Sequence, residues 1–563
     1  MGNTIRTLRR VEMKHLQGVD LTQRAAVEAS LQRLIEEKQA QKNDPGANSG
    51  YYIKTAQTYL KEIQNEPTLR LRLAAIEREI FSLNQPQTYP YHLAPVGSQT
   101  VFAAQGEMAG EVTDSTVLLQ SRLTSVPGPD LDAQGNIPGT RGGGYFEWTA
   151  GQDFHQPLRT PWLEAKPKSD SIVRARLEKL KPGTRYAYRF VFGPDQDHTT
   201  TGPVRYFRTL DPTNTKATLT FCLGNCMNYH AFMSGQANGD GPVTATVEDK
   251  RLGYPSFAAM LQLCPDFFIG AGDTVYYDHP TNAPATTLAE MRRKWHEQFR
   301  FPRLVSFFAA CPVYWLKDDH DFRFDDADQT GGQSPSPALG SSIFREQLPV
   351  LPQGDDRSRN FRTHQVHPDL QIWFLEGRDF RSPNAQPDGP EKSLWGKEQR
   401  DWLERTLSAS PATWKIIVTP TPMVGPDRAN KKDNHTNPGG FHREAEDFFA
   451  WLKNQQLPNV LLFCGDRHWQ YHSIHPSGVE EYSMGALNDE NSIAGIRPGN
   501  SQSTDPEGRI RQVFLYPEAT GGFICVRLQR QKDNTPELRI EFRDDQGKIL
   551  HQEVRTPAPA RKP

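Results

Sequence analysis

The feature that most constrains the fold is an alternation of apolar strands with amphipathic helices between residues 215 and 500. Strand–helix alternation of this kind is typical of a layered α/β domain. In such sheets, ligand groups gather just beyond the carboxyl ends of the strands. The predicted strands are ATLTFCLG, DFFIGAG, PVYWLK, LQIWFLE, WKIIVTP and NVLLFCG, and the predicted helices are SFAAMLQL, TLAEMRRKWHEQF, KEQRDWLERTL and REAEDFFAWLKNQ.

Two segments of different character precede this domain. Short β-rich runs such as TVLLQSRL, IVRARL, RYAYRFVF and VRYFRTL predict a small β-sandwich of fibronectin or immunoglobulin type. Further upstream, Leu31, Leu34 and Ile35 share one face of a predicted helix. The expected parts are a helical N-terminal segment (1–90), a β-sandwich domain (91–212), an α/β domain (213–556) and a disordered tail (557–563).

Charge and hydropathy exclude several classes of partner. The formal net charge of −2 gives no reason to expect a nucleic-acid or membrane-surface partner. No apolar run approaches the roughly 18 residues that span a bilayer. The basic start MGNTIRTLRRVEMKH is not followed by an apolar segment, so it does not read as a signal peptide.

The six cysteines do not form a dense disulfide framework in a chain of 563 residues. Most lie inside apolar runs such as LTFCL, LLFCG and GFICV, where a buried free thiol is expected. Cys226 differs, because it falls just past the end of its run. Its thiol is therefore expected to be presented at the strand end.

Polar residues follow five of the predicted strands. One such ending is usually a solvated turn. Five on one side of a sheet would bring carboxylates together, and these repel one another unless cations lie among them. The strand ends carry Asn225-Cys226, Asp273 with Tyr276 and Tyr277, Asp318-Asp319-His320-Asp321, Gly377-Arg378-Asp379, and Asp466-Arg467-His468.

The residue types indicate which cations to expect. Thiolate and phenolate ligands favour a redox-capable transition metal such as iron, whereas aspartate-rich positions favour calcium, magnesium or manganese. Two cations bridged by one carboxylate are the usual arrangement for hydrolysing phosphoesters. Asp273, which follows the glycine of GAGD, is the candidate bridge.

These motifs resemble a known family. GDTVYY, DDHD and GDRH, in that order, are similar to the pattern of calcineurin-like metallophosphoesterases. WLKDDHD, FLEGRDFRS and GKEQRDWLERTLSASPATWKIIV more closely resemble PhoD-type alkaline phosphatases, over about residues 95 to 550. The resemblance implies a four-layer α/β/β/α core in the 213–556 domain and hydrolysis of phosphomonoesters and phosphodiesters. It also implies an extracytoplasmic location.

The resemblance further implies roles for individual residues. His320 would contact the phosphoryl group and protonate the leaving alkoxide, and a histidine suits this because its pKa lies near working pH. Arg378 would bind a phosphate oxygen, or form an ion pair with a neighbouring carboxylate instead. Asn225 would contact substrate where the superfamily has an aspartate. Iron (Fe3+) would be held by Cys226, Asp273, Tyr276 and His468, and one or two calcium ions, or other divalent metals, by Asp273, Asp319 and Asp466.

Several alternatives stay open at this point. Either Asp318 or Asp319 is the ligand, although alignment of DH with the superfamily's NH favours Asp319. The superfamily places a histidine ligand in a strand resembling IIVTPTP, where this chain has only Thr419, Pro420 and Thr421. A phosphodiesterase or phospholipase-D-like hydrolase on the same site, or a binding protein retaining the fold, are the competing functions. The insertion at 422–440 could shape the pocket, and the Gly/Asn/Pro loop with His435 and His442 could line the site entrance.

Overall fold

A computed structural model describes residues 24–40, 53, 57, 100–151, 154–235, 245–352 and 359–558. The chain divides into one unit of Met1–Ala94 with Leu261–Cys264, and a second of Pro95–Met260 with Pro265–Pro563. In the first unit, α2 (Arg24–Ala40) confirms the predicted helical face, because Leu31, Leu34 and Ile35 are buried. The helix predicted at PTLRLRLAAIEREIFSL lies outside the described residues.

The second unit contains a nine-stranded sheet with the strand order β22-β21-β20-β10-β11-β12-β1-β2-β6. Its centre is three parallel strands that the sequence predicted, with Gly224 of β10 opposite Gly270 of β11 and Ile269 of β11 opposite Tyr314 of β12. A C-terminal hairpin of β20 and β21 extends the sheet through an antiparallel pairing of β20 with β10. The bounds are β10 (Leu219–Gly224), β11 (Phe267–Ala271), β12 (Val313–Leu316), β20 (Gly522–Arg530), β21 (Pro536–Asp544) and β22 (Ile549–Arg555).

A seven-stranded sheet follows in the chain, with the order β13-β14-β15-β16-β18-β17-β19. The three predicted strands LQIWFLE, WKIIVTP and NVLLFCG form its parallel centre as β14, β15 and β16. The bounds are β13 (Arg362–His367), β14 (Leu370–Phe374), β15 (Trp414–Thr419), β16 (Val460–Cys464), β17 (Gln470–Ile474), β18 (Glu480–Met484) and β19 (Arg511–Leu515).

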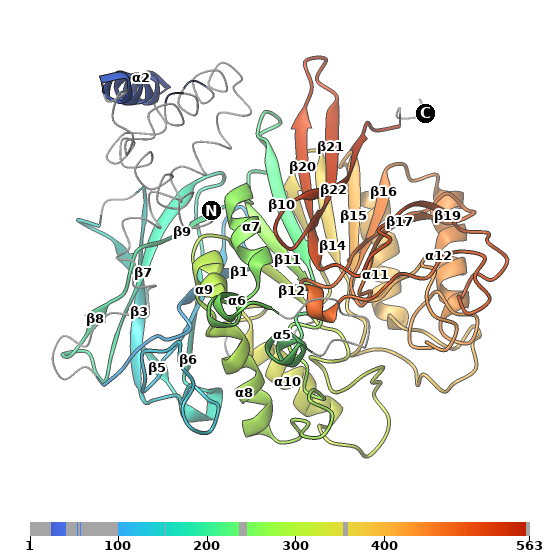
Figure 1. The fold of residues 1–563 in the computed structure, drawn as a ribbon, viewed down its shortest axis with the longest axis horizontal. Coiled ribbons are helices and arrows are strands. Elements are labelled where there is room, and N and C mark those ends of the chain that lie inside the picture. The colour runs from blue at the N-terminus through green and yellow to red at the C-terminus, as the bar shows by residue number, and fades with distance from the viewer. Residues whose placement is uncertain are drawn as a thin grey trace. The chain divides into compact units, whose positions relative to one another are not determined.

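The two sheets pack face to face because each strand divides its apolar side chains between two layers. Ile416 and Val418 of β15 belong to the central core, whereas Ile417 between them faces a second cluster with α11 and α12. On the outer face of the nine-stranded sheet, Phe257 of α7 packs on Phe268 of β11. Figure 1 shows α7, α8 and α9 on one side of the paired sheets and α11 and α12 on the other. The helices are α5 (Tyr229–Ser234), α6 (Val247–Leu252), α7 (Pro255–Leu263), α8 (Leu288–Phe299), α9 (Pro302–Phe308), α10 (Pro337–Gln347), α11 (Gly396–Ala409) and α12 (His442–Gln455), with short 3-10 turns η1 (Pro167–Ser169) and η2 (Asp489–Asn491).

The strands of residues 107–208 divide between two sheets. Three of them, β1, β2 and β6, continue the nine-stranded sheet through a parallel contact of Gly110 with Val313. The others form a six-stranded sheet, whose Phe146 and Phe190 share the central core with Phe221 of β10. The α/β class is therefore confirmed, while a separate sandwich domain at 91–212 stays a prediction. The bounds are β1 (Glu107–Gly110), β2 (Val117–Arg122), β3 (Gly142–Ala150), β4 (Leu158–Arg159), β5 (Leu163–Ala165), β6 (Ile172–Leu177), β7 (Arg185–Gly193), β8 (Thr200–Thr201) and β9 (Arg205–Arg208).

Among the described residues, no helix is long and apolar enough to cross a membrane.

Candidate metal centre

Three predicted ligands share an unusual backbone conformation at the ends of three strands. Cys226, Asp273 and Asp466 have positive φ angles of 56°, 55° and 62°. A non-glycine residue in this region costs on the order of 1 kcal/mol or more, and such strain gathers at functional sites. A Cβ on Gly465 would lie only 2.4 Å from the carbonyl oxygen of Ala271, so β16 and β11 of the two sheets meet at these ends. The fold therefore brings the three ligands to one edge.

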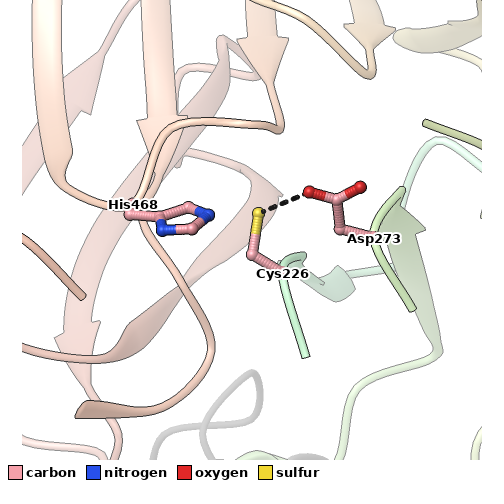
Figure 2. Close-up of side chains that lie close together, drawn as sticks. All are labelled: Cys226, Asp273 and His468. Carbon is pink, nitrogen blue, oxygen red and sulfur yellow. Dashed lines mark hydrogen bonds between the residues drawn. The ribbon is translucent and has the colours of Figure 1, made fainter. Parts of the chain in front are cut away.

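The first cluster contains Cys226, Asp273 and His468, with one ligand atom from each lying within 4.8 Å of the others. Figure 2 shows the thiol of Cys226 between the His468 ring and the Asp273 carboxylate, with Sγ 3.3 Å from Oδ2 of Asp273. The Tyr276 hydroxyl lies 3.3 Å from the same Oδ2 and 3.4 Å from Nε2 of His468. The four residues predicted to hold iron are therefore neighbours.

The protonation behaviour of Cys226 and His468 is what a cation site requires. Burial raises the pKa of the Cys226 thiol, and the negative charges of Asp273 and Asp466 raise it further. Burial lowers the pKa of His468, so its imidazole is neutral. A thiol becomes a thiolate beside a metal ion, and a histidine must be neutral to bind one. The donor set therefore fits a transition metal.

Asp273 is shared by two further clusters, one with Asp319 and His320 and one with Asp318 and Asp466. Oδ2 of Asp318 and Oδ1 of Asp319 are buried and have no hydrogen-bond partner among the described residues. Buried carboxylate oxygens of this kind need a partner, and a cation supplies one. Both aspartates therefore stay candidate ligands, and Asp273 stays the candidate bridge.

Asp321 supports this edge from behind. Its Oδ1 accepts a hydrogen bond from the Asp318 backbone N–H at 2.7 Å, and its Oδ2 accepts one from that of Thr274 at 3.0 Å. One carboxylate thus ties the loop after β12 to the loop after β11.

His320 lies over the first cluster, where its ring stacks on Tyr276 with the ring centres 4.0 Å apart. Nδ1 of His320 is 2.8 Å from Oδ1 of Asp278. Burial opposes a charge on the ring, but Asp278, Asp319 and Asp273 outweigh it and hold the pKa of His320 well above its usual value. The ring is therefore protonated, as a proton donor must be.

Arg378 is surrounded by carboxylates. Of the two roles that the sequence left open for it, these contacts are those of an ion pair with neighbouring carboxylates. The side chain is fully buried, with Nε donating to Oδ1 of Asp318 at 2.7 Å and Nη2 to Oδ2 of Asp433 at 3.2 Å. A third donor, Nη1, contacts the carbonyl oxygen of Ala327 at 2.9 Å. The predicted contact of Arg378 with a phosphate oxygen stays a prediction.

Asn225 also makes its contacts within the protein. With its amide oriented to satisfy both neighbours, Nδ2 donates to the Gly485 carbonyl at 2.8 Å and Oδ1 accepts from the Asp466 N–H at 3.0 Å. These bonds fix the loop that carries Asp466. Substrate binding by Asn225 stays a prediction.

Several residues of the site gave no signal in the sequence. Asn491 of η2 donates to the Cys226 carbonyl oxygen and to the Tyr276 hydroxyl, both at 3.0 Å. Asp278 ends the motif GDTVYYD, and only the pairing with His320 shows its role. Asp433 lies with Asp319 and Asp326 in a fourth cluster of candidate ligands, which contains carboxylates alone.

The loop at 422–440 is held by a buried carboxylate. Oε1 of Glu481 accepts from the Gly425 N–H at 2.8 Å, while Oε2 accepts from the N–H groups of Met423 and Val424. His435 of this loop is fully buried and lies 2.9 Å from Oε2 of Glu444, so it is a core residue and does not line an entrance. The loop instead delivers Lys431 and Asp433 to the metal edge.

Two packed sheets with one aspartate shared between clusters of candidate ligand atoms at their common edge are the arrangement that the resemblance to metallophosphoesterases predicted. In agreement, residues 226–497 match the family model of PhoD-like phosphatases. The resemblance that the sequence predicted is thereby confirmed for this segment.

Individual relatives agree with this result. The chain is 24% identical over 413 residues to alkaline phosphatase D of Bacillus subtilis (strain 168), and the match covers 64% of each chain, somewhat less than two thirds of that relative. A solved structure of PhoD is similar with a TM-score of 0.62 and 20% identity, over 82% of this chain and 90% of that one. A purple acid phosphatase from seeds of yellow lupin (Lupinus luteus) gives 0.52 and 13%, over 80% and 73%. These two structures support the fold.

Proposed function

We propose that this protein is a metal-dependent hydrolase of phosphomonoesters and phosphodiesters. The observation that carries the proposal is the position of Asp273, which belongs to three clusters of ligand atoms at one edge of the fold. One carboxylate between two cations is the arrangement that hydrolyses phosphoesters. The relative named alkaline phosphatase D supports the same reaction class.

We further propose that the centre holds iron and calcium. Cys226, Tyr276 and His468 with Asp273 supply the soft and aromatic donors that suit Fe3+. Asp273, Asp319 and Asp466 supply only oxygens, which suit Ca2+, and the unpartnered Oδ2 of Asp318 adds a further oxygen. When bound, such cations activate water and stabilise charge on the attacking and leaving oxygens.

The protein's own residues then handle the proton of the leaving group. We assign His320 as the donor, which gives its Nε2 proton to the leaving alkoxide oxygen. Asp278 occupies Nδ1, so it fixes the ring orientation and keeps the cationic form stable. Arg378 balances the charge of Asp318 and Asp433, and Asn225 positions the Asp466 loop.

Hydrolysis assays would test this proposal. Metal-loaded protein should cleave p-nitrophenyl phosphate or bis-p-nitrophenyl phosphate, and the ratio of the two rates separates a phosphatase from a phosphodiesterase or phospholipase-D-like enzyme. Metal analysis should find iron and calcium, with a visible absorption band from Tyr276 phenolate on Fe3+. A fully metal-loaded protein that cleaves neither ester would favour the binding-protein alternative.

The extracytoplasmic location is a separate proposal. It rests on the resemblance to PhoD-type phosphatases and on a site suited to calcium. Cell fractionation tests it, because the protein should then appear outside the cytoplasm of its native host.

A further inference from the structure

Lys431 lies beside the proposed reaction site, on the loop held by Glu481. Its side chain is 12% exposed, and Nζ lies 2.9 Å from Oδ1 of Asp325 while also contacting Asp326. Burial disfavours its charge, but Asp433, Asp326, Asp325 and Asp466 outweigh that effect and keep its pKa above the usual value. A fixed positive charge therefore stands at the edge of the metal centre.

Asp325 separates this charge from His320. Its side chain is 64% exposed, and its Oδ1 lies 3.9 Å from Nε2 of His320 as well as 2.9 Å from Nζ of Lys431. The backbone N–H of Asp325 donates to Oδ2 of Asp278 at 2.9 Å, and the other oxygen of Asp278 binds the His320 ring. One exposed carboxylate oxygen thus lies between the proposed proton donor and a largely buried ammonium group.

We propose that Lys431 and Nε2 of His320 flank a subsite for a peripheral oxygen of a phosphoryl group, and that the Asp325 carboxylate occupies this subsite in the present structure. The inference rests on the proposed hydrolase function and adds a substrate preference to it. Ammonium and imidazolium groups bind phosphate oxygens as readily as carboxylate oxygens. An incoming phosphoryl oxygen therefore competes with Asp325 for Lys431, while Nε2 of His320, 3.9 Å from Oδ1 of Asp325, is left to donate to the leaving oxygen.

The subsite favours monoesters over diesters. A phosphomonoester dianion carries three unsubstituted oxygens, so one charged oxygen is still available for Lys431 after the metal edge has bound the others. A diester carries an alkyl or aryl group on one of these oxygens and has one negative charge less. Lys431 therefore binds the free oxygen of the monoester directly. It favours the diester less, because the diester has a bulky group at this position and one negative charge less.

The competing explanation is that Lys431 only anchors the loop. The contacts show that other residues also anchor it. The start of the loop is held by Glu481, and Asn434 within it binds Oδ2 of Asp427 at 2.8 Å. Asp326 also contacts Lys431, so the ion pair with exposed Asp325 is not required to anchor the side chain. Of the two ion pairs of Lys431, the one with Asp325 is thus the one that a phosphate oxygen could replace.

Steady-state kinetics of the metal-loaded full chain would test the subsite. Lys431→Gln should raise KM for p-nitrophenyl phosphate about 10- to 100-fold, the cost of one charge-assisted hydrogen bond, and Ki for inorganic phosphate by the same factor. KM for bis-p-nitrophenyl phosphate should change less than about threefold, on the scale of a screened exposed charge. Lys431→Arg should restore most of the monoester KM.

Two further variants separate binding from loop structure. Lys432→Gln is the matched control, because Lys432 is the exposed neighbour on the same loop and should leave both KM values unchanged. Asp325→Asn should lower KM for the monoester and Ki for phosphate about three- to fivefold, since the internal competitor loses its charge. Loosening of the loop by Asp325→Asn would instead withdraw Lys431 and raise the monoester KM, which is the opposite of the expected change.

The subsite can fail independently of the proposed function. Equal phosphate Ki values for Lys431→Gln and Lys432→Gln, with an active enzyme, would overturn the subsite and leave the hydrolase intact. If the wild type cleaves neither ester, the hydrolase proposal fails. Calorimetric titration with inorganic phosphate then decides, and absent or Lys431-independent phosphate binding overturns the subsite.

Discussion

The carboxylate of Asp273 lies 3.3 Å from the Cys226 thiol, and both residues have a left-handed backbone conformation at the end of a parallel strand. Neither conformation is cheap for a non-glycine residue. The residues after β10 and β11 are therefore held in a strained backbone conformation, and this conformation brings their two ligand atoms together.

Replacing Asp273 should remove the binding of both types of metal. Asp273→Asn keeps the shape of the side chain but removes the charge that three ligand clusters share. Iron and calcium content, measured by mass spectrometry, should both fall, and the visible band should disappear. The exposed Asp195→Asn serves as control and should retain both metals. Loss of calcium alone would show that Asp273 is not the bridge.

His320→Asn should separate chemistry from metal binding. The ring is assigned to proton transfer, so kcat should fall about 10²- to 10⁴-fold. Iron and calcium content should stay at the wild-type level, because Asp273, Asp319 and the other ligands are unchanged. A variant that loses metal would instead place His320 among the ligands.

Asp278→Asn should move the pH dependence of the rate. Beyond the opposing effect of burial, Asp278 is the foremost group that raises the pKa of His320. The protonated ring is the active form, so kcat is maintained below this pKa and falls as pH rises through it. Removing the carboxylate lowers the pKa, and the alkaline limb of the profile should shift to lower pH. An unshifted limb would assign it to another group.

The sequence predicted the strands and most of the ligands for a physical reason. Apolar runs such as that of β15 can only be buried strands, and the polar residues behind parallel strands must meet at one edge. That reasoning reached Cys226, Asp273 and His468. It did not reach the contact of Gly110 with Val313 that joins β1 to the large sheet, because a single pairing between distant residues leaves no local pattern.

The positions of the residues in the 422–440 loop could not be predicted from the sequence for a related reason. Lys431 and Asp433 lie in a stretch without periodicity, so nothing local fixes where their side chains point. Their placement depends on Glu481, which is 56 residues away from Gly425 in the sequence. Asn491 is likewise 265 residues from Cys226, whose carbonyl it binds. Such bonds become visible only in three dimensions.

His472 should make stability depend on pH at the far side of the two sheets. Its ring lies 2.7 Å from Glu553 and 3.0 Å from Glu480, and these carboxylates raise its pKa against the effect of burial. A raised folded-state pKa contributes stability that is fully present below the unfolded value of about 6.5 and is lost as pH rises through the folded value.

The comparison of His472→Gln with wild type would measure this contribution. The difference in the free energy of unfolding should be largest below about pH 6.5 and should shrink at higher pH, with each unit of pKa difference worth about 1.4 kcal/mol. A difference that is constant with pH would mean that His472 contributes by packing alone.

Glu481 should control the activity without touching the metal edge. It accepts hydrogen bonds from the backbone of Met423, Val424 and Gly425 and from the Tyr471 hydroxyl, all in a buried setting. Glu481→Gln places an NH2 group against backbone donors, and each donor left unpaired costs about 1–3 kcal/mol. The loop that carries Lys431 should therefore detach more readily than the sheets unfold.

Limited proteolysis and kinetics distinguish this local effect from global unfolding. Glu481→Gln should be cleaved within residues 422–440 faster than wild type, with KM for p-nitrophenyl phosphate raised and iron content unchanged, since Cys226, Asp273, Tyr276 and His468 lie on other segments. Because Glu481 also belongs to β18, the thermal transition should fall by only a few degrees if the loop opens first. A large fall in the transition together with loss of iron would show that Glu481 stabilises the sheet, and that loop and metal centre unfold as one unit.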